Sequence, residues 1–102
     1  MTGRGAIVKL MAVSRAERRF ERRPRVAACF PPAQVEPALD LLELLELAWH
    51  DCYGDITPSE EIVDDVLLLS DGDLAGLIGA ARLATTDWRD LKLNAAERRD
   101  RR

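Results

Sequence analysis

The chain has 102 residues, which is enough for one small domain. Its formal net charge is −3, and its two cysteines are too few for the disulfide framework of a small secreted protein. No apolar run approaches the about 18 residues of a transmembrane helix, so the sequence predicts no membrane association. We therefore expect a cytoplasmic protein with free thiols.

The charge is distributed unevenly along the chain. Residues 1–32 carry a net charge of +6, residues 33–88 carry −12, and residues 89–102 carry +3. This asymmetry predicts that basic ends flank an acidic middle. Arginine outnumbers lysine thirteen to two, which is typical of a protein from a GC-rich bacterial genome.

The first thirteen residues favour neither a strand nor a helix. Residues 5–13 loosely resemble the apolar part of a signal peptide, but Lys9 interrupts them and charged residues follow where a cleavage site is expected. Met11 is an alternative start of the protein.

Residues 14–23 have the pattern of a short helix. Ser14 and Glu17 have the spacing of a capping box, and Pro24 is expected to end the helix. The residues that share one of its faces are Arg15, Arg18, Arg19 and Arg22. A helix this short needs a partner to be stable. The sequence leaves nucleic acid, another protein and the acidic side of its own core open as partners, and the simplest expectation is a solvated arm.

Three prolines within residues 25–37 predict a linker, and a central helix follows from about Val35 to Tyr53. Gly54 is expected to cap its C-terminus. The apolar side chains of this helix, Cys52 included, span an arc of roughly 180°, against the about 100° that a surface helix needs. We therefore expect contact with two neighbouring helices. The apolar residues expected to point away from the core are Leu39, Leu47, Leu68 and Leu83.

Two further helices follow after short connections. Thr57 is expected to cap the first, with Glu60 closing a capping box, and Ser70 to cap the second, with Asp73 closing the box. Apolar residues at helical spacing extend the last helix through Trp88, which is expected to be largely buried, to Leu91 or beyond.

These patterns predict an all-α fold, with a small three-helix core, with or without a short N-terminal helix, flanked by charged and partly flexible termini. We divide the chain into a basic N-terminal arm and proline-containing linker (1–34), a helical domain (35–92) and a charged C-terminal tail (93–102).

The apolar surface is generous for three helices, so we expect either a homodimer or a helical protein partner. Two glycines in the last helix support this view, because glycine inside a helix costs roughly 1 kcal/mol relative to alanine and permits close approach of another helix. The alternative is a weak helix start. The candidate partner-binding residues are Leu41, Leu44, Leu47, Gly76, Gly79 and Leu83.

No motif in the sequence indicates catalysis, a metal or a cofactor. His50 and Cys52 lie about 200° apart on a helix, so they cannot face one ion. The paired carboxylates stand at helix starts, where capping accounts for them.

The sequence therefore favours a small interaction or regulatory module that is not an enzyme. The alternative is a nucleic-acid-associated regulator that binds through Arg15, Arg18, Arg19 and Arg22, because clustered arginines neutralise phosphates. An acidic mimic of nucleic acid, built on the carboxylates between Glu36 and Asp65, is a further alternative.

Overall fold

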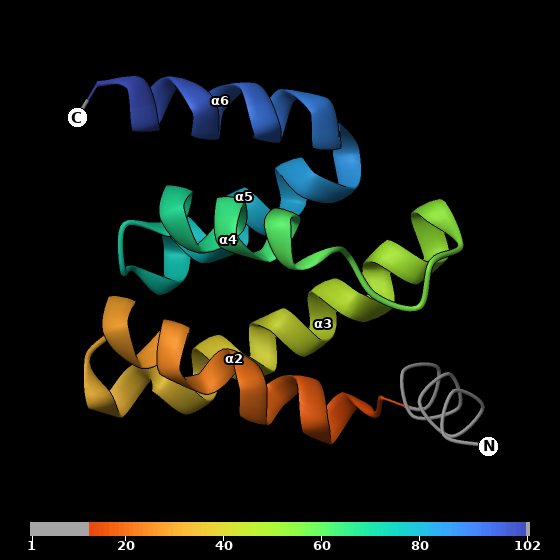
Figure 1. Cartoon of the computed structure of the whole chain (residues 1–102), viewed down its shortest axis with the longest axis vertical. Coiled ribbons are helices and arrows are strands. Elements are labelled where there is room, and N and C mark those ends of the chain that lie inside the picture. The colour runs from red at the N-terminus through yellow and green to blue at the C-terminus, as the bar shows by residue number, and fades with distance from the viewer. Residues whose placement is uncertain (1–12, 102) are drawn as a thin grey trace, which may run out of the picture.

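The computed structural model describes residues 13–101, which form five α-helices and one short 3-10 turn without any strand (Figure 1). The elements are α2 (Arg15–Cys29), η1 (Pro32–Gln34), α3 (Val35–Tyr53), α4 (Glu60–Ser70), α5 (Leu74–Thr86) and α6 (Trp88–Asp100). The predicted all-α fold is confirmed for this part of the chain. The expectations for residues 1–12 lie outside it.

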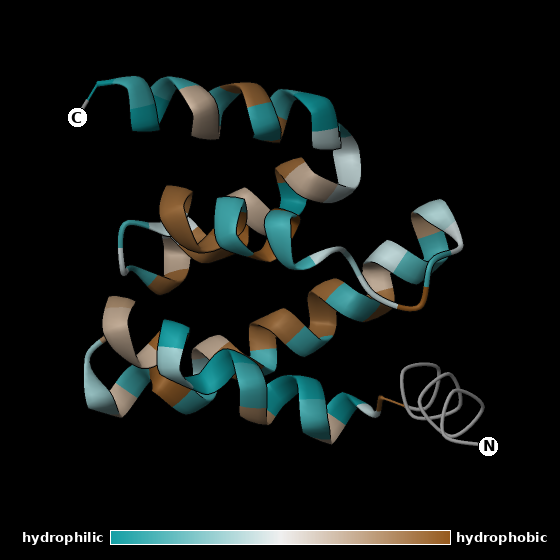
Figure 2. Cartoon of the chain, in the orientation of Figure 1, coloured by the Kyte–Doolittle hydropathy of each residue, from teal (hydrophilic) through white to brown (hydrophobic). Residues whose placement is uncertain are grey.

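The helices are arranged in layers along the long axis of the molecule. In Figure 1, α2 and α3 lie side by side at the lower end, α4 and α5 occupy the middle, and α6 covers the upper end. Figure 2 shows that α2 and α6 are mostly hydrophilic, whereas α3, α4 and α5 carry most of the hydrophobic residues. The core therefore lies in the middle of the stack, and the charged helices cover its two ends.

Two predicted helix caps are confirmed. Ser14 caps α2, and its hydroxyl accepts a hydrogen bond from the backbone N–H of Glu17, whose side chain completes the capping box. Gly54 ends α3 with a φ of 82°, a left-handed conformation that glycine adopts without a steric cost.

The two other predicted caps are wrong by a few residues. α4 is capped by Ser59, whose hydroxyl accepts from the backbone N–H of Ile62, while Thr57 lies before the helix. α5 is capped by Asp73, and Ser70 is the last residue of α4. In both places the sequence offers two capping residues close together, and the hydroxyl of the other one is engaged elsewhere. The hydroxyl of Thr57 donates to Glu46, and that of Ser70 donates to the carbonyl of Leu67 in its own helix.

The prediction that Pro24 ends the first helix is wrong, because α2 continues through this proline to Cys29. A proline inside a helix removes one backbone hydrogen bond. Beyond it, Val26 and Phe30 are 0% and 4% exposed, so burial of the last turn against the core offsets that loss. Only the remainder of the predicted linker, including η1, connects α2 to α3.

The predicted third helix is two helices that meet at Asp87. The backbone of Asp87 is extended, and its carboxylate accepts hydrogen bonds from the backbone N–H groups of Arg89 and Asp90. Apolar spacing does not reveal the break, because Leu91 and Ala95 beyond it are both 0% exposed. The expected charged tail from residue 93 onward is thus part of α6 as far as residue 100.

Several predicted side-chain orientations are also wrong. Leu39 is 1% exposed and belongs to the core, because α2 covers the side of α3 that was expected to face solvent. Cys52 is exposed although it was expected on the apolar side of its helix, and the side chain of Trp88, expected to be largely buried, is 37% exposed. Leu47, by contrast, is exposed as predicted.

Candidate functional site

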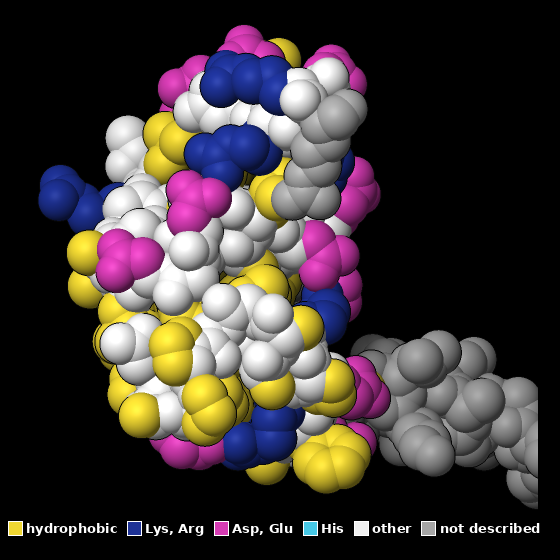
Figure 3. Space-filling view, turned by 90° about the vertical axis from the view of Figure 1, so that its left-hand side faces the viewer, with side chains coloured by type: hydrophobic (Ala, Val, Ile, Leu, Met, Phe, Trp, Pro, Cys, Tyr) yellow, Lys and Arg dark blue, Asp and Glu magenta, His cyan; other side chains and the backbone are white. Residues whose placement is uncertain are grey.

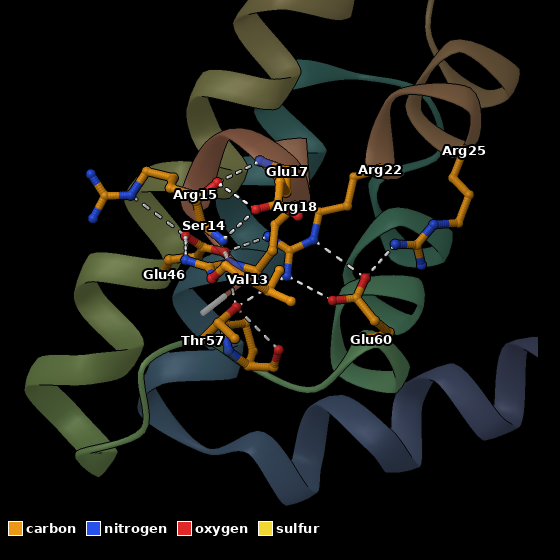
Figure 4. A network of polar contacts seen from close by, with 11 residues as sticks. Val13, Ser14, Arg15, Glu17, Arg18, Arg22, Arg25, Glu46, Thr57 and Glu60 are labelled. Carbon is orange, nitrogen blue, oxygen red and sulfur yellow. Dashed lines mark hydrogen bonds and ion pairs between the residues drawn. The ribbon is translucent and has the colours of Figure 1, made fainter. Parts of the chain in front are cut away.

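The arginine face of α2 lies against the acidic side of α3 and the start of α4 (Figure 4). Its centre is Glu46, which is 2% exposed. Arg18 donates from Nε and Nη2 to the two carboxylate oxygens of Glu46 at 2.5 and 3.0 Å, and Arg22 donates from Nη1 at 2.7 Å. The hydroxyl of Thr57 donates to the same carboxylate at 2.9 Å. Glu46 is therefore a buried anion that accepts four hydrogen bonds from three residues.

Arg22 joins three elements of the fold. It is 2% exposed, and besides Glu46 it contacts Thr57 at 3.0 Å and Glu60 at 2.8 Å through Nη2. Burial tends to raise the pKa of Glu46, but the hydrogen bonds from Arg18, Thr57 and Arg22 outweigh it and hold that pKa below its ordinary value. The pKa of Glu60 is lowered in the same way, against the effect of burial, by Arg22 and a second arginine, Arg25.

The remaining two arginines of this face are also paired. The guanidinium of Arg19 binds Glu36 and Asp40 at 2.9 Å each and also contacts Glu43. Arg15 lies 3.6 Å from Glu46 and is the most exposed of the four arginines, with 51% of its side chain exposed.

The expectation of a solvated arm is therefore wrong for residues 15–29, and the acidic side of the core is the partner of this helix. A phosphate backbone would have to displace carboxylates from all four guanidinium groups. The structure thus places the candidate nucleic-acid residues in contacts within the chain, and two of them are largely withdrawn from solvent.

The candidate partner-binding residues separate into three places. Leu41 and Leu44 line a groove of about 160 Å³ between α3 and α5. Its other lining residues are Leu45, Ala48, Ile78, Ala81, Arg82 and Thr85. Leu47 lines a different hollow, together with His50 and Ile56. Figure 3 shows that hydrophobic side chains also gather on one face of the molecule at the level that α2 and α3 occupy in Figure 1.

Gly76, Gly79 and Leu83 lie together in a third place, a hollow of about 390 Å³ between α5 and α6. The α6 side of this hollow is polar. A Cβ atom at Gly76 would clash with the carbonyl oxygen of Ser70, whereas a Cβ at Gly79 would meet no atom of the described residues within 4 Å. The first glycine is therefore explained by close packing within the chain, and only the second leaves space for another molecule.

Sequence reasoning missed a cavity of about 430 Å³ where α3, α4 and α6 meet. Trp49, Tyr53 and Trp88, which are the only tryptophans and the only tyrosine of the chain, all line it. The spacing of Trp49 and Tyr53 places them on one face of α3, which is a signal present in the sequence. Trp88 joins them only through the break at Asp87, which the sequence pattern did not reveal.

Among residues 13–101 no group of three His, Cys, Asp or Glu side chains is arranged to hold a metal ion. None of the helices in this range is both long and apolar enough to cross a membrane. Comparison of the chain with family models, curated proteins and solved structures gave no match.

Proposed function

We propose that this chain is a small interaction module, of the regulatory or adaptor kind and without catalytic activity, that associates with a second copy of itself. The observation that carries this proposal is the groove between α3 and α5. Leu44 and Ile78 stand at this groove with 57% and 47% of their surfaces exposed. Exposed aliphatic side chains gathered at one groove are typical of an interaction surface.

The shape of the groove suits a second copy. It offers both protruding side chains, Leu44 and Ile78, and a recess between two helices. A two-fold axis would bring the protruding side chains of each copy to the recess of the other, because a two-fold interface uses the same patch on both subunits.

The charges beside the groove are complementary as well. Arg82 lines the groove on α5, and Asp51 lies on the same stripe of α3 as Leu44, seven residues further along. Within the described part of the chain, neither Arg82 nor Asp51 forms an ion pair. An arrangement of two copies that faces Arg82 of one toward Asp51 of the other would satisfy both charges.

Sedimentation equilibrium over a range from about 1 to 100 μM tests the proposal. We expect a monomer–dimer equilibrium for the native chain and a monomer for Leu44→Glu and Ile78→Glu, because a buried unpaired charge opposes association. Leu93→Glu is the matched control, since Leu93 is 64% exposed on α6, and it should associate as the native chain does. A native chain that stays monomeric throughout this range would refute the proposal.

A further inference from the structure

The cavity where α3, α4 and α6 meet has the size and the lining of a small-molecule site. Its volume of about 430 Å³ falls within the range of about 300–1,000 Å³ typical of ligand pockets. Its lining residues are Trp49, Tyr53, Asp55, Ser59, Glu61, Ile62, Trp88 and Lys92. Three helices and the connection between α3 and α4 thus line one space, which is independent of the groove between α3 and α5.

Aromatic rings form the walls of this cavity, and contacts within the fold hold two of them in place. The rings of Trp49 and Tyr53 have their centroids 4.4 Å apart at an angle of 58°. The hydroxyl of Tyr53 donates to the backbone carbonyl of Ala84 at 2.9 Å, so its ring is fixed against α5. Trp88 completes the wall from α6 and remains 37% exposed. The guanidinium of Arg89 lies 5.5 Å from its ring centroid, a distance typical of a cation–π contact.

The charge of the lining favours a cation. Among the described residues Lys92 is the only basic one that lines the cavity, and its ammonium already binds Glu61 at 3.1 Å and lies 3.5 Å from Asp65. Asp55 is an exposed carboxylate at the mouth, where it lies 3.4 Å from the indole N–H of Trp49. No cation within residues 13–101 lies within ion-pair distance of Asp55. The lining therefore includes one carboxylate that forms no ion pair with the described residues and is open to a ligand.

From the aromatic walls and this carboxylate we infer that the cavity binds a small organic cation of the methylated-ammonium class. The methyl groups contact the rings of Trp49 and Tyr53 and the face of Trp88 that Arg89 does not cover, because the faces of aromatic rings attract a cation through their quadrupoles. Asp55 faces the positive charge. A methylated ammonium suits such a site because it carries charge without N–H donors, so its transfer from water costs less than that of a primary amine.

Titration of the full chain with choline, followed by tryptophan fluorescence and isothermal calorimetry, tests this inference. We expect saturable binding, and binding at least about tenfold weaker for 3,3-dimethyl-1-butanol, the neutral isostere of choline, because the cation–π and ion-pair attractions are lost. Equal binding of the two compounds, or a signal that does not saturate, would overturn the inference.

Two variants test the assigned residues, each beside a matched control. Trp88→Ala and Asp55→Asn should each weaken choline binding at least about fivefold, while Phe20→Ala, which removes an aromatic side chain that is 76% exposed on α2, should leave it unchanged. Asp90→Asn, at an exposed carboxylate of α6 outside the cavity, is the control for Asp55→Asn. Native affinity in Asp55→Asn, with its native circular dichroism retained, would refute the role of the carboxylate even if Trp88→Ala failed to fold.

The same methylated headgroup occurs on free small molecules and on trimethylated lysine side chains. A short peptide with one trimethyl-lysine therefore forms a separate arm of the titration. Choline binding at least as tightly as the peptide supports a free ligand, whereas binding of the peptide alone would overturn that assignment.

Discussion

Replacing Glu46 by glutamine should destabilise the protein more than any other single carboxylate-to-amide change on α3. The variant keeps the shape of the side chain but leaves the guanidinium groups of Arg18 and Arg22 without the buried anion that both bind. Removing one partner of a buried ion pair costs about 3–5 kcal/mol. Because Arg22 retains Glu60 and Thr57, we expect the lower end of this range, about 3 kcal/mol.

Urea unfolding followed by circular dichroism measures this loss. With a slope of about 2 kcal/mol per molar urea, a loss of about 3 kcal/mol lowers the unfolding midpoint by about 1.5 M. The control is Glu43→Gln on the same helix. Among residues 13–101 the carboxylate of Glu43 forms an ion pair only with Arg19, which keeps two other carboxylates, so its loss should cost less than about 1 kcal/mol. If the urea midpoint of Glu46→Gln equalled that of Glu43→Gln, the stabilising role assigned to the contacts of Glu46 with Arg18 and Arg22 would be refuted.

Two further predictions concern the helix glycines and acid stability. Gly79→Ala should stabilise the protein by up to about 1 kcal/mol in the same urea assay, because the site is open and alanine favours the helix. Gly76→Ala should destabilise it by about 1–3 kcal/mol, because its Cβ would clash with the Ser70 carbonyl; equal effects would contradict this packing. Hydrogen bonds from Arg23 and Arg19 lower the pKa of Glu36 from 4.5 to about 2. Glu36 thus binds a proton more readily in the unfolded chain than in the folded one. Its contribution to the free energy of unfolding should therefore be complete above about pH 4.5 and be lost as the pH falls toward 2. A urea midpoint that stays constant between pH 6 and pH 3 would contradict this.

Local signals in the sequence predicted the elements well where one residue type has one structural role. Ser14 with Glu17 fixes the start of α2, and Gly54 supplies the left-handed end of α3. Where several residues can fulfil the same role, the local pattern was insufficient. Asp87 has the preferences of a helix cap, yet it lies within an apolar periodicity that continues to Leu91, so the break depends on how α6 packs on α4.

The sequence pattern could not predict which distant helices pack against one another, and the reason is a different one. The arginine face of α2 could be read from its spacing, and so could the acids of α3, but long-range charge complementarity does not specify which surfaces meet. The burial of Leu39 follows from that meeting, and so does the inclusion of Glu46 in the interior. The aromatic cavity has the same origin, since it forms only when Trp88 is brought back to the end of α3.

The geometry around Glu46 also limits which amino-acid substitutions the protein tolerates at Arg18 and Arg22. Arg18 uses two nitrogens of one planar group to bind both oxygens of a carboxylate, and Arg22 uses its two terminal nitrogens to bind different helices. A lysine ammonium is a single point of charge and cannot reproduce either arrangement. Mutational drift from arginine to lysine is therefore opposed at these two positions, whereas it meets little resistance at Arg101, whose side chain is 73% exposed. Part of the arginine-rich composition of this chain is thus required by its fold, whatever the base composition of the gene.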